Sequence, residues 1–147
     1  MSALRDAIVL HLQNDSNVTD AILAARQAAE HDTTPPAVYP GLPFKGASYP
    51  FIVVTAQRAP VGDWAFQQVA LEDAVYLVKA IDQNTSAKTV GEINALIRAS
   101  LNLASLTITG YTSLGINWLS DVQYDELDNG IVYQHEGGLY NLMAEPT

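Results

Sequence analysis

The chain has 147 residues, and its 16 acidic and seven basic residues give a formal net charge of −9 at pH 7. It contains no cysteine, which excludes disulfides and thiolate-bound metals. No stretch approaches the roughly 20 apolar residues of a transmembrane helix, and the start lacks a signal-peptide pattern. The basic residues are scattered, so the clustered cations that bind a nucleic-acid backbone are missing. We therefore expect a soluble protein with a single domain, residues 1–147.

The first two predicted elements are amphipathic helices. Apolar residues recur at helical spacing through 3–13 and again through 18–29, so each segment would bury one face. Ser16 or Asn17, in the polar break between the segments, can cap the second helix. That helix has one basic residue, Arg26, and therefore lacks the cations of a DNA-reading helix–turn–helix.

A long proline-rich loop is predicted over 31–49. It contains four prolines and two glycines, which prevent regular structure. Loops of this length in compact domains are usually functional or disordered. The apolar residues in the loop predict that it packs against its own domain or against a neighbour; they are Val38, Tyr39, Leu42 and Phe44.

The middle of the chain predicts two strands separated by a turn. Residues 51–57 are rich in β-branched side chains, and residues 58–65 contain Pro60 and Gly62, which favour a turn. Residues 66–82 fit both strand alternation and helical spacing. We favour a strand there, because valines and a tyrosine near its end raise the β propensity.

A third helix is predicted over 86–102, followed by a short strand over 106–111. Either Ser86 or Thr89 can cap this helix, and with Thr89 as the cap Glu92 would complete a capping box. The predicted order of elements is ααββαβββ. It indicates an α+β fold, in which an antiparallel β-sheet with a long C-terminal β-hairpin packs against about three α-helices.

The long hairpin is predicted over 114–143, with its turn at Asn129 and Gly130. This pair suits a type I′ turn, in which both central residues have positive φ. In the resulting register Tyr124 faces His135, and both share one face of the hairpin with Val122 and Tyr133.

A bulge is predicted at Gly137 and Gly138, where two glycines interrupt the second strand of the hairpin. One inserted residue there would move Tyr140 and Leu142 onto the face of Ile116 and Trp118. The apolar side of the hairpin would then continue past the glycines.

Carboxylates near His135 raise the alternative of an acid–base or metal site. They are Asp121, Asp125, Glu126, Asp128 and Glu136. The register puts Asp125 and Glu136 on the face opposite His135, so we interpret His135 as a structural residue between tyrosines. The acidic run lacks the spacing of a calcium loop, and neither a phosphate loop nor a nucleophile elbow is present. We predict no catalytic residue, no cofactor and no metal site.

Three segments resemble the tail-terminator (tail-completion) proteins of long-tailed bacteriophages. Two of them are VALEDAVYLVKAID at 69–82 and KTVGEINALIRASLN at 88–102. The third is the hairpin, where the family often has a Tyr-x-Glu strand, a turn and a Tyr-x-His-x-Gly-Gly-x-Tyr strand. The matching residues are Tyr124, Glu126, Tyr133, His135, Gly137, Gly138 and Tyr140. The opening helix, the proline-rich loop and the Tyr-Pro-Phe-Ile-Val-Val strand at 49–54 also fit.

The resemblance implies a structural virion protein without enzymatic activity. Its subunits would form a hexameric ring that caps the tail tube at its final length and offers a docking surface to the head-to-tail connector. The partners would be further copies of the chain, the tail tube protein and the head-closure or connector protein. DNA would pass through the lumen without specific binding, and an acidic lumen would help by repelling it. The location would be the tail–neck junction of the virion, after assembly in the host cytoplasm.

For the ring interface we predict the loop at 35–49 and the segment at 58–64, because of their exposure and apolar content. The candidate residues are Tyr39, Leu42, Phe44, Tyr49, Arg58 and Trp64. The same residues could instead cover their own sheet. Two other functions remain open: another neck or tail component, such as a head-closure or tube protein, and a small-molecule-binding domain with a pocket near Trp118 and His135.

Overall fold

The computed structural model describes residues 3–43, 46–65, 68–83 and 87–147, with the backbone alone for 58–65 and 68–70. Its helices are α1 (Ala3–Gln13), α2 (Ser16–Ala28) and α3 (Ala87–Leu101). Its strands are β1 (Val38–Tyr39), β2 (Phe51–Ala65), β3 (Gln68–Gln83), β4 (Thr107–Ile108), β5 (Tyr111–Asp128) and β6 (Ile131–Pro146). The predicted α+β class is confirmed, and the short strand β1 lies within the segment predicted as an irregular loop.

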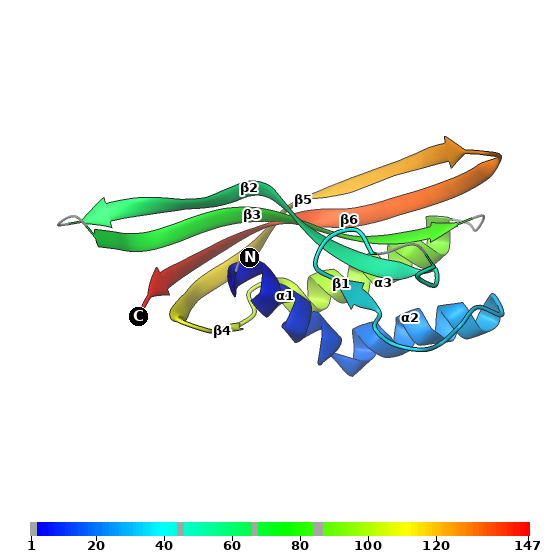
Figure 1. Cartoon of the computed structure of the whole chain (residues 1–147), viewed down its shortest axis with the longest axis horizontal. Helices are drawn as coiled ribbons and strands as arrows, with labels where there is room; N and C mark the ends of the chain where they lie inside the picture. Colours follow the sequence, from blue (N-terminus) through cyan, green and yellow to red (C-terminus); the bar gives the residue numbers. More distant parts are fainter. Residues whose placement is uncertain (1–2, 44–45, 66–67, 84–86) are drawn as a thin grey trace.

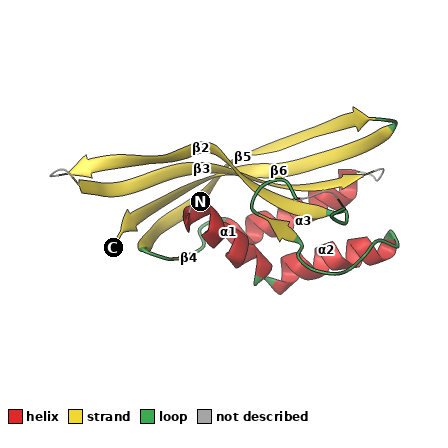
Figure 2. Cartoon of the chain, in the orientation of Figure 1, coloured by secondary structure: helices red, strands yellow, loops and turns green. Residues whose placement is uncertain are grey.

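The six strands form one sheet in the order β1-β2-β3-β6-β5-β4. All neighbouring strands are antiparallel except β1 and β2, which are parallel. The β2–β3 and β5–β6 hairpins reach toward opposite ends of the molecule, and the helices all lie on one side of the sheet (Figure 1). Colouring by secondary structure makes these two layers, strands above and helices below, easy to follow (Figure 2).

The main core lies between the helices and one face of the sheet, which we call the helix face. The predicted apolar stripes of the helices are buried in it, including Leu4, Ile8, Leu12, Val18, Ile22, Val90, Ile93, Ile97 and Leu101. The sheet contributes alternate residues from its strands, including Ile52, Val54, Tyr76, Val78, Ile116, Tyr140 and Leu142. The helices therefore form where their apolar periodicity predicts, because each buries one stripe against the sheet.

The opposite side of the sheet, which we call the open face, has a smaller apolar cluster. Phe51, Val53 and Ile81 are buried there, and Tyr39 and Tyr49 pack against them. Because Tyr39 and Tyr49 belong to the proline-rich segment, this segment partly covers the open face of the sheet near the start of β2.

The helix caps differ from those predicted. Asp15 is the N-cap of α2, and its Oδ1 accepts a hydrogen bond from the backbone N–H of Asn17 at 2.9 Å. The cap thus lies one residue before Ser16, which is already helical. Thr89 lies inside α3 and so does not cap it, whereas Ser86 falls outside the described residues.

Residues 58–65 belong to strand β2, and the prediction of a turn there is wrong. Pairing with β3 continues to the end of the strand, where Ala65 faces Gln68. The register shifts between Arg58 and Val61. Pro60 lies within this irregularity, where a missing N–H does not interrupt a regular ladder. Proline and glycine therefore mark an irregular strand here and not its end.

The predicted register of the C-terminal hairpin is confirmed. Tyr124 faces His135, and the turn residues Asn129 and Gly130 both have positive φ, at 50° and 76°. The predicted bulge at the paired glycines is wrong, because β6 pairs with β3 from 133 to 144 without a shift. The extra residues lie on β5 instead, and one of them is Leu119.

The glycines of β6 serve close packing. A Cβ on Gly137 would lie 2.3 Å from the carbonyl oxygen of Val78. A Cβ on Gly138 would lie 3.1 Å from the ring of Tyr140 and 3.2 Å from that of Trp118. A strand glycine can mark either a bulge or a close approach, and here it marks the second.

The extra residue Leu119 divides β5 between the two faces of the sheet. Before it, Ile116 and Trp118 face Leu142 and Tyr140 across the ladder and lie on the helix face, so their predicted shared face is confirmed. After it, Tyr124 pairs with His135 on the open face. One inserted residue reverses the side to which every later side chain points.

Candidate assembly surfaces

The predicted interface residues of the proline-rich segment lie in different surroundings. The ring of Tyr39 meets Phe51 edge-on at 5.8 Å between centroids, and Tyr49 lies 4.8 Å from Phe51 and 5.7 Å from Tyr133. Burial raises the pKa of Tyr49. Leu42, in contrast, is 79% exposed to solvent.

The other three candidates are only partly described. Arg58 and Trp64 lie on β2, opposite Val75 and Val69 of β3, but their side chains are outside the description. Phe44 falls outside the described residues altogether. Leu42 is therefore the candidate whose exposed side chain can be placed.

Arg26 holds the proline-rich segment against the body of the protein. It is fully buried, and burial lowers its pKa. Its Nε donates to the carbonyl oxygen of Pro50 at 3.0 Å, Nη1 to that of Thr34 at 3.1 Å and Nη2 to that of Pro36 at 3.2 Å. We did not assign this role from the sequence. The signal was available, because Arg26 is four residues after the buried Ile22 on the apolar stripe of α2.

A group of polar side chains surrounds His135 on the open face. The ring of His135 stacks on Tyr124 with centroids 4.4 Å apart and an interplanar angle of 13°. Its Nε2 lies 2.5 Å from Oε1 of Glu126, and Nζ of Lys79 donates to the hydroxyl of Tyr124 at 2.5 Å. Glu126, which pairs with Tyr133 across the hairpin, adds a carboxylate to the predicted position of His135 between tyrosines.

The imidazole of His135 favours its neutral form. Burial is the main cause of its lowered pKa, and the nearby charge of Lys79 acts in the same direction, while Glu126 opposes both. The group brings together His135, Tyr124, Glu126 and Lys79. The hydrogen bond from Lys79 on β3 to Tyr124 on β5 spans the strand β6 between them. This group of side chains therefore holds the C-terminal hairpin to the rest of the sheet.

Trp118 lies on the other side of the sheet from His135. The guanidinium of Arg98 on α3 lies 3.6 Å from the centroid of its ring, and its Nε1 donates to Oδ1 of Asp121 at 3.1 Å. The predicted pocket lined by Trp118 and His135 is therefore wrong, because the extra residue Leu119 separates the two onto opposite faces.

The acidic residues of the hairpin are likewise divided. Asp121 and Glu136 lie under α3, where Nδ2 of Asn94 is 3.4 Å from Oδ1 of Asp121 and 3.5 Å from Oε2 of Glu136. Glu126 lies on the open face with His135.

Within the described ranges, no group of three or more His, Asp or Glu residues lies close enough to hold a metal ion. No helix in those ranges is long and apolar enough to cross a membrane.

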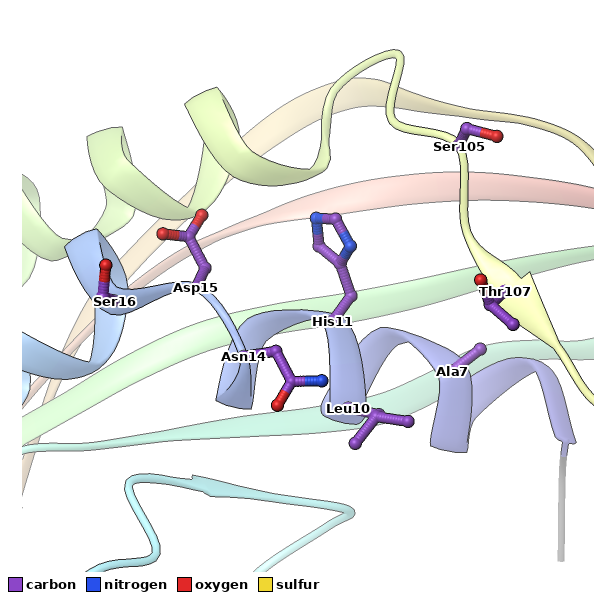
Figure 3. Close-up of a pocket in the computed structure, with 8 residues that line it drawn as sticks. All are labelled: Ala7, Leu10, His11, Asn14, Asp15, Ser16, Ser105 and Thr107. Carbon is purple, nitrogen blue, oxygen red and sulfur yellow. The ribbon is translucent and has the colours of Figure 1, made fainter.

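A shallow groove of about 450 Å³ runs between α1 and the segment that leads into β4 (Figure 3). It is lined by Ala7, Leu10, His11, Asn14, Asp15, Ser16, Ser105 and Thr107. Its ionisable groups already have partners within the protein. Nε2 of His11 is 3.1 Å from the carbonyl oxygen of Ser100, and the nearby Ser100 side chain is the largest cause of the lowered pKa of Asp15. The groove thus offers a surface and not an acid–base pair.

Comparison with known proteins gives a match in the structure and not in the sequence. No protein-family model matches the chain, and no curated protein matches it. The fold matches a chain of a virion. That solved structure is described as "Virion of native gene transfer agent (GTA) particle", and its chain is 15% identical to this one with a TM-score of 0.65. The match covers 97% of this chain and 94% of that chain, so the two share their fold over nearly their full lengths.

Proposed function

We propose that this protein is a structural, non-enzymatic component of a bacteriophage-like virion, and specifically a tail terminator. The observation that carries the proposal is the fold shared with a chain of the gene transfer agent virion across 97% of the protein. The resemblance of the hairpin to tail-terminator proteins supports the same reading from the sequence, and the residues that carry this resemblance lie on the two strands of the hairpin.

In this proposal six copies form a ring at the tail–neck junction, assembled in the host cytoplasm. The ring stacks on the last ring of tube protein, stops its addition and presents a surface to the head-closure or connector protein. A ring needs two different surfaces on each subunit, which meet head to tail around a rotation axis. The two hairpins offer two such surfaces at opposite ends of the subunit, because they reach in opposite directions (Figure 1).

The proposed ring interface comprises Tyr39, Leu42, Phe44, Tyr49, Arg58 and Trp64, with the exposed Leu42 as its apolar contact. The net charge of −9 supports a lumen through which DNA passes without binding, since an acidic surface repels phosphates. No cofactor or metal takes part in this function.

Native mass spectrometry tests the ring directly. Six chains of 15.9 kDa would give a particle of about 95 kDa. Electron microscopy of tail tubes that grow with and without the protein tests the role. A terminator should limit tube length and bind at one end, whereas a tube protein would be incorporated along the whole tube. Unchanged tube lengths together with unoccupied tube ends would overturn the proposal.

A matched pair of substitutions tests the interface. Leu42→Asp should reduce the hexamer at least tenfold, because it places a charge in an apolar contact. Leu103→Asp is the control, because Leu103 is 77% exposed and lies outside the proposed interface. Its φ of 63° also suits aspartate. Equal hexamer populations in both variants would remove Leu42 from the interface.

A further inference from the structure

The outer edge of β5 is covered over one part of its length and free over another. β4 pairs with it at Tyr111 and Thr112. Further along, the carbonyl oxygen of Ile116 accepts from the N–H of Leu103 at 2.8 Å, and the N–H of Trp118 donates to Oδ1 of Asn102 at 3.0 Å. After Trp118 the cover stops. From 119 to 128 no strand of the described sheet pairs with this edge.

The outward-facing backbone groups of this free edge suit a binding partner in an extended conformation. In an antiparallel ladder, alternate residues direct their N–H and C=O groups away from the partner strand. The two-residue turn makes Asp128 and Ile131 a hydrogen-bonded pair, so Asp121, Gln123, Asp125 and Leu127 direct their backbone groups outward. Among protein ligands, an extended segment that adds as a further strand is the shape that matches such a row.

The charge around this edge specifies the composition of the ligand. Residues 99–147 contain six carboxylates and no Lys or Arg. Three of the carboxylates, Asp125, Glu126 and Asp128, belong to exposed residues at the distal part of the edge. Leu127 is 75% exposed and Leu119 is 50% exposed, so each end of the free edge also presents an apolar side chain.

A second copy of the chain does not meet these requirements. Any two of its basic residues are at least nine positions apart in the sequence, so no strand of this protein carries a cluster of cations. Each copy also has a net charge of −9, which disfavours bringing a second copy against this acidic edge. The occupant must come from a different protein.

We propose that the edge of β5 from Leu119 to Asp128 docks an extended segment, rich in Lys or Arg, from a partner protein. The segment adds as a strand beside β5, and its cations face Asp125 and Asp128 while its apolar residues reach Leu119 and Leu127. This goes beyond the proposed ring, and it holds whether or not the chain forms one.

A titration of the full-length protein with two blocked nine-residue peptides tests the docking. One carries pairs of adjacent lysines, whose side chains face both sides of a strand, separated by valine and threonine, and the other has glutamate in place of lysine. The lysine peptide should bind and shift the amide NMR signals of 119–128, and its affinity should fall about tenfold between low and physiological salt. The glutamate peptide should not bind. Equal binding of both peptides, or shifts confined to other strands, would overturn the proposal.

Two variants separate charge from backbone pairing. Asp125→Lys should weaken binding of the lysine peptide at least tenfold, whereas Glu145→Lys, with the same change of charge at the other end of β6, should alter it less than twofold. Gln123→Pro removes an outward N–H and should also abolish binding, while the β5–β6 ladder persists. If the protein self-associates instead, and Gln123→Pro abolishes that association, the occupant is a second copy and the proposal is wrong.

Discussion

The imidazole of His135 lies almost parallel to the ring of Tyr124, 4.4 Å between centroids, and it is 95% buried in this position. Its pKa is lowered, mainly by burial, so the unfolded chain binds a proton more readily than the folded one. The contribution of His135 to stability is therefore complete above the ordinary pKa of 6.5 and is lost as the pH falls through the lowered value.

We expect the free energy of unfolding to fall with pH below about 6.5, and to fall less steeply in the variant His135→Phe. Phenylalanine keeps the stacking on Tyr124 and removes the titrating group. Urea unfolding at a series of pH values measures both slopes. Parallel curves for the two proteins would mean that another group causes the pH dependence.

The two glycines of β6 should differ in their tolerance of a methyl group. Gly137→Ala should cost about 3 kcal/mol or more, because its Cβ would overlap the backbone of Val78 and Lys79. Gly138→Ala should cost about 1 kcal/mol, since the rings of Trp118 and Tyr140 can yield by a few tenths of an ångström. Chemical denaturation gives both values, and the reverse order would contradict the close approach of β6 to β3.

Replacement of Arg26 should loosen the proline-rich segment before it affects the sheet. Arg26→Met leaves the carbonyl groups of Pro50, Thr34 and Pro36 without their donor and should cost about 3 kcal/mol. Arg26→Lys, which keeps the charge but not the fork of donors, should recover only part of that loss. Urea unfolding measures the stability, and limited proteolysis should show faster cleavage within 31–49. Full recovery with lysine would show that charge alone is sufficient.

Deletion of Leu119 should be far more damaging than its replacement. Leu119→Ser removes a half-exposed side chain and should change the free energy of unfolding by less than about 0.5 kcal/mol. The deletion removes the change of phase, so either Trp118 or Tyr124 must leave its face of the sheet. We expect loss of a cooperative unfolding transition in circular dichroism. A deletion variant as stable as the serine variant would refute this role for the bulge.

Local patterns predicted much of the fold. The helical stripes, the Asn129–Gly130 turn and the pairing of Tyr124 with His135 follow from periodicity and turn chemistry, which act between near neighbours in the sequence. The strand over 58–65 could not be predicted in this way, because Pro60 and Gly62 favour a turn locally and only pairing with β3 overrides them. The partners of Arg26 lie 8 to 24 residues away, beyond the reach of any local rule.

The site residues were harder to predict than the fold for one physical reason. A single extra residue decides which side chains share a face, and Leu119 has no feature that distinguishes it from its neighbours. Its insertion placed Trp118 with Arg98 and left His135 with Glu126 on the other side. The sequence pointed instead to Gly137 and Gly138, whose lack of side chains is required by the neighbouring strands.

The tip of the C-terminal hairpin has a consequence for how stability is distributed. Within the described residues, β3 accompanies β6 only as far as the Gln83–Tyr133 pair, and beyond it β5 and β6 continue as two strands. Two strands without a third are marginal in water. Hydrogen exchange should therefore report frequent local opening at the tip and protection close to that of global unfolding between α3 and the sheet. A bound strand would act where opening is easiest, so part of its binding energy would appear as slower exchange at the tip.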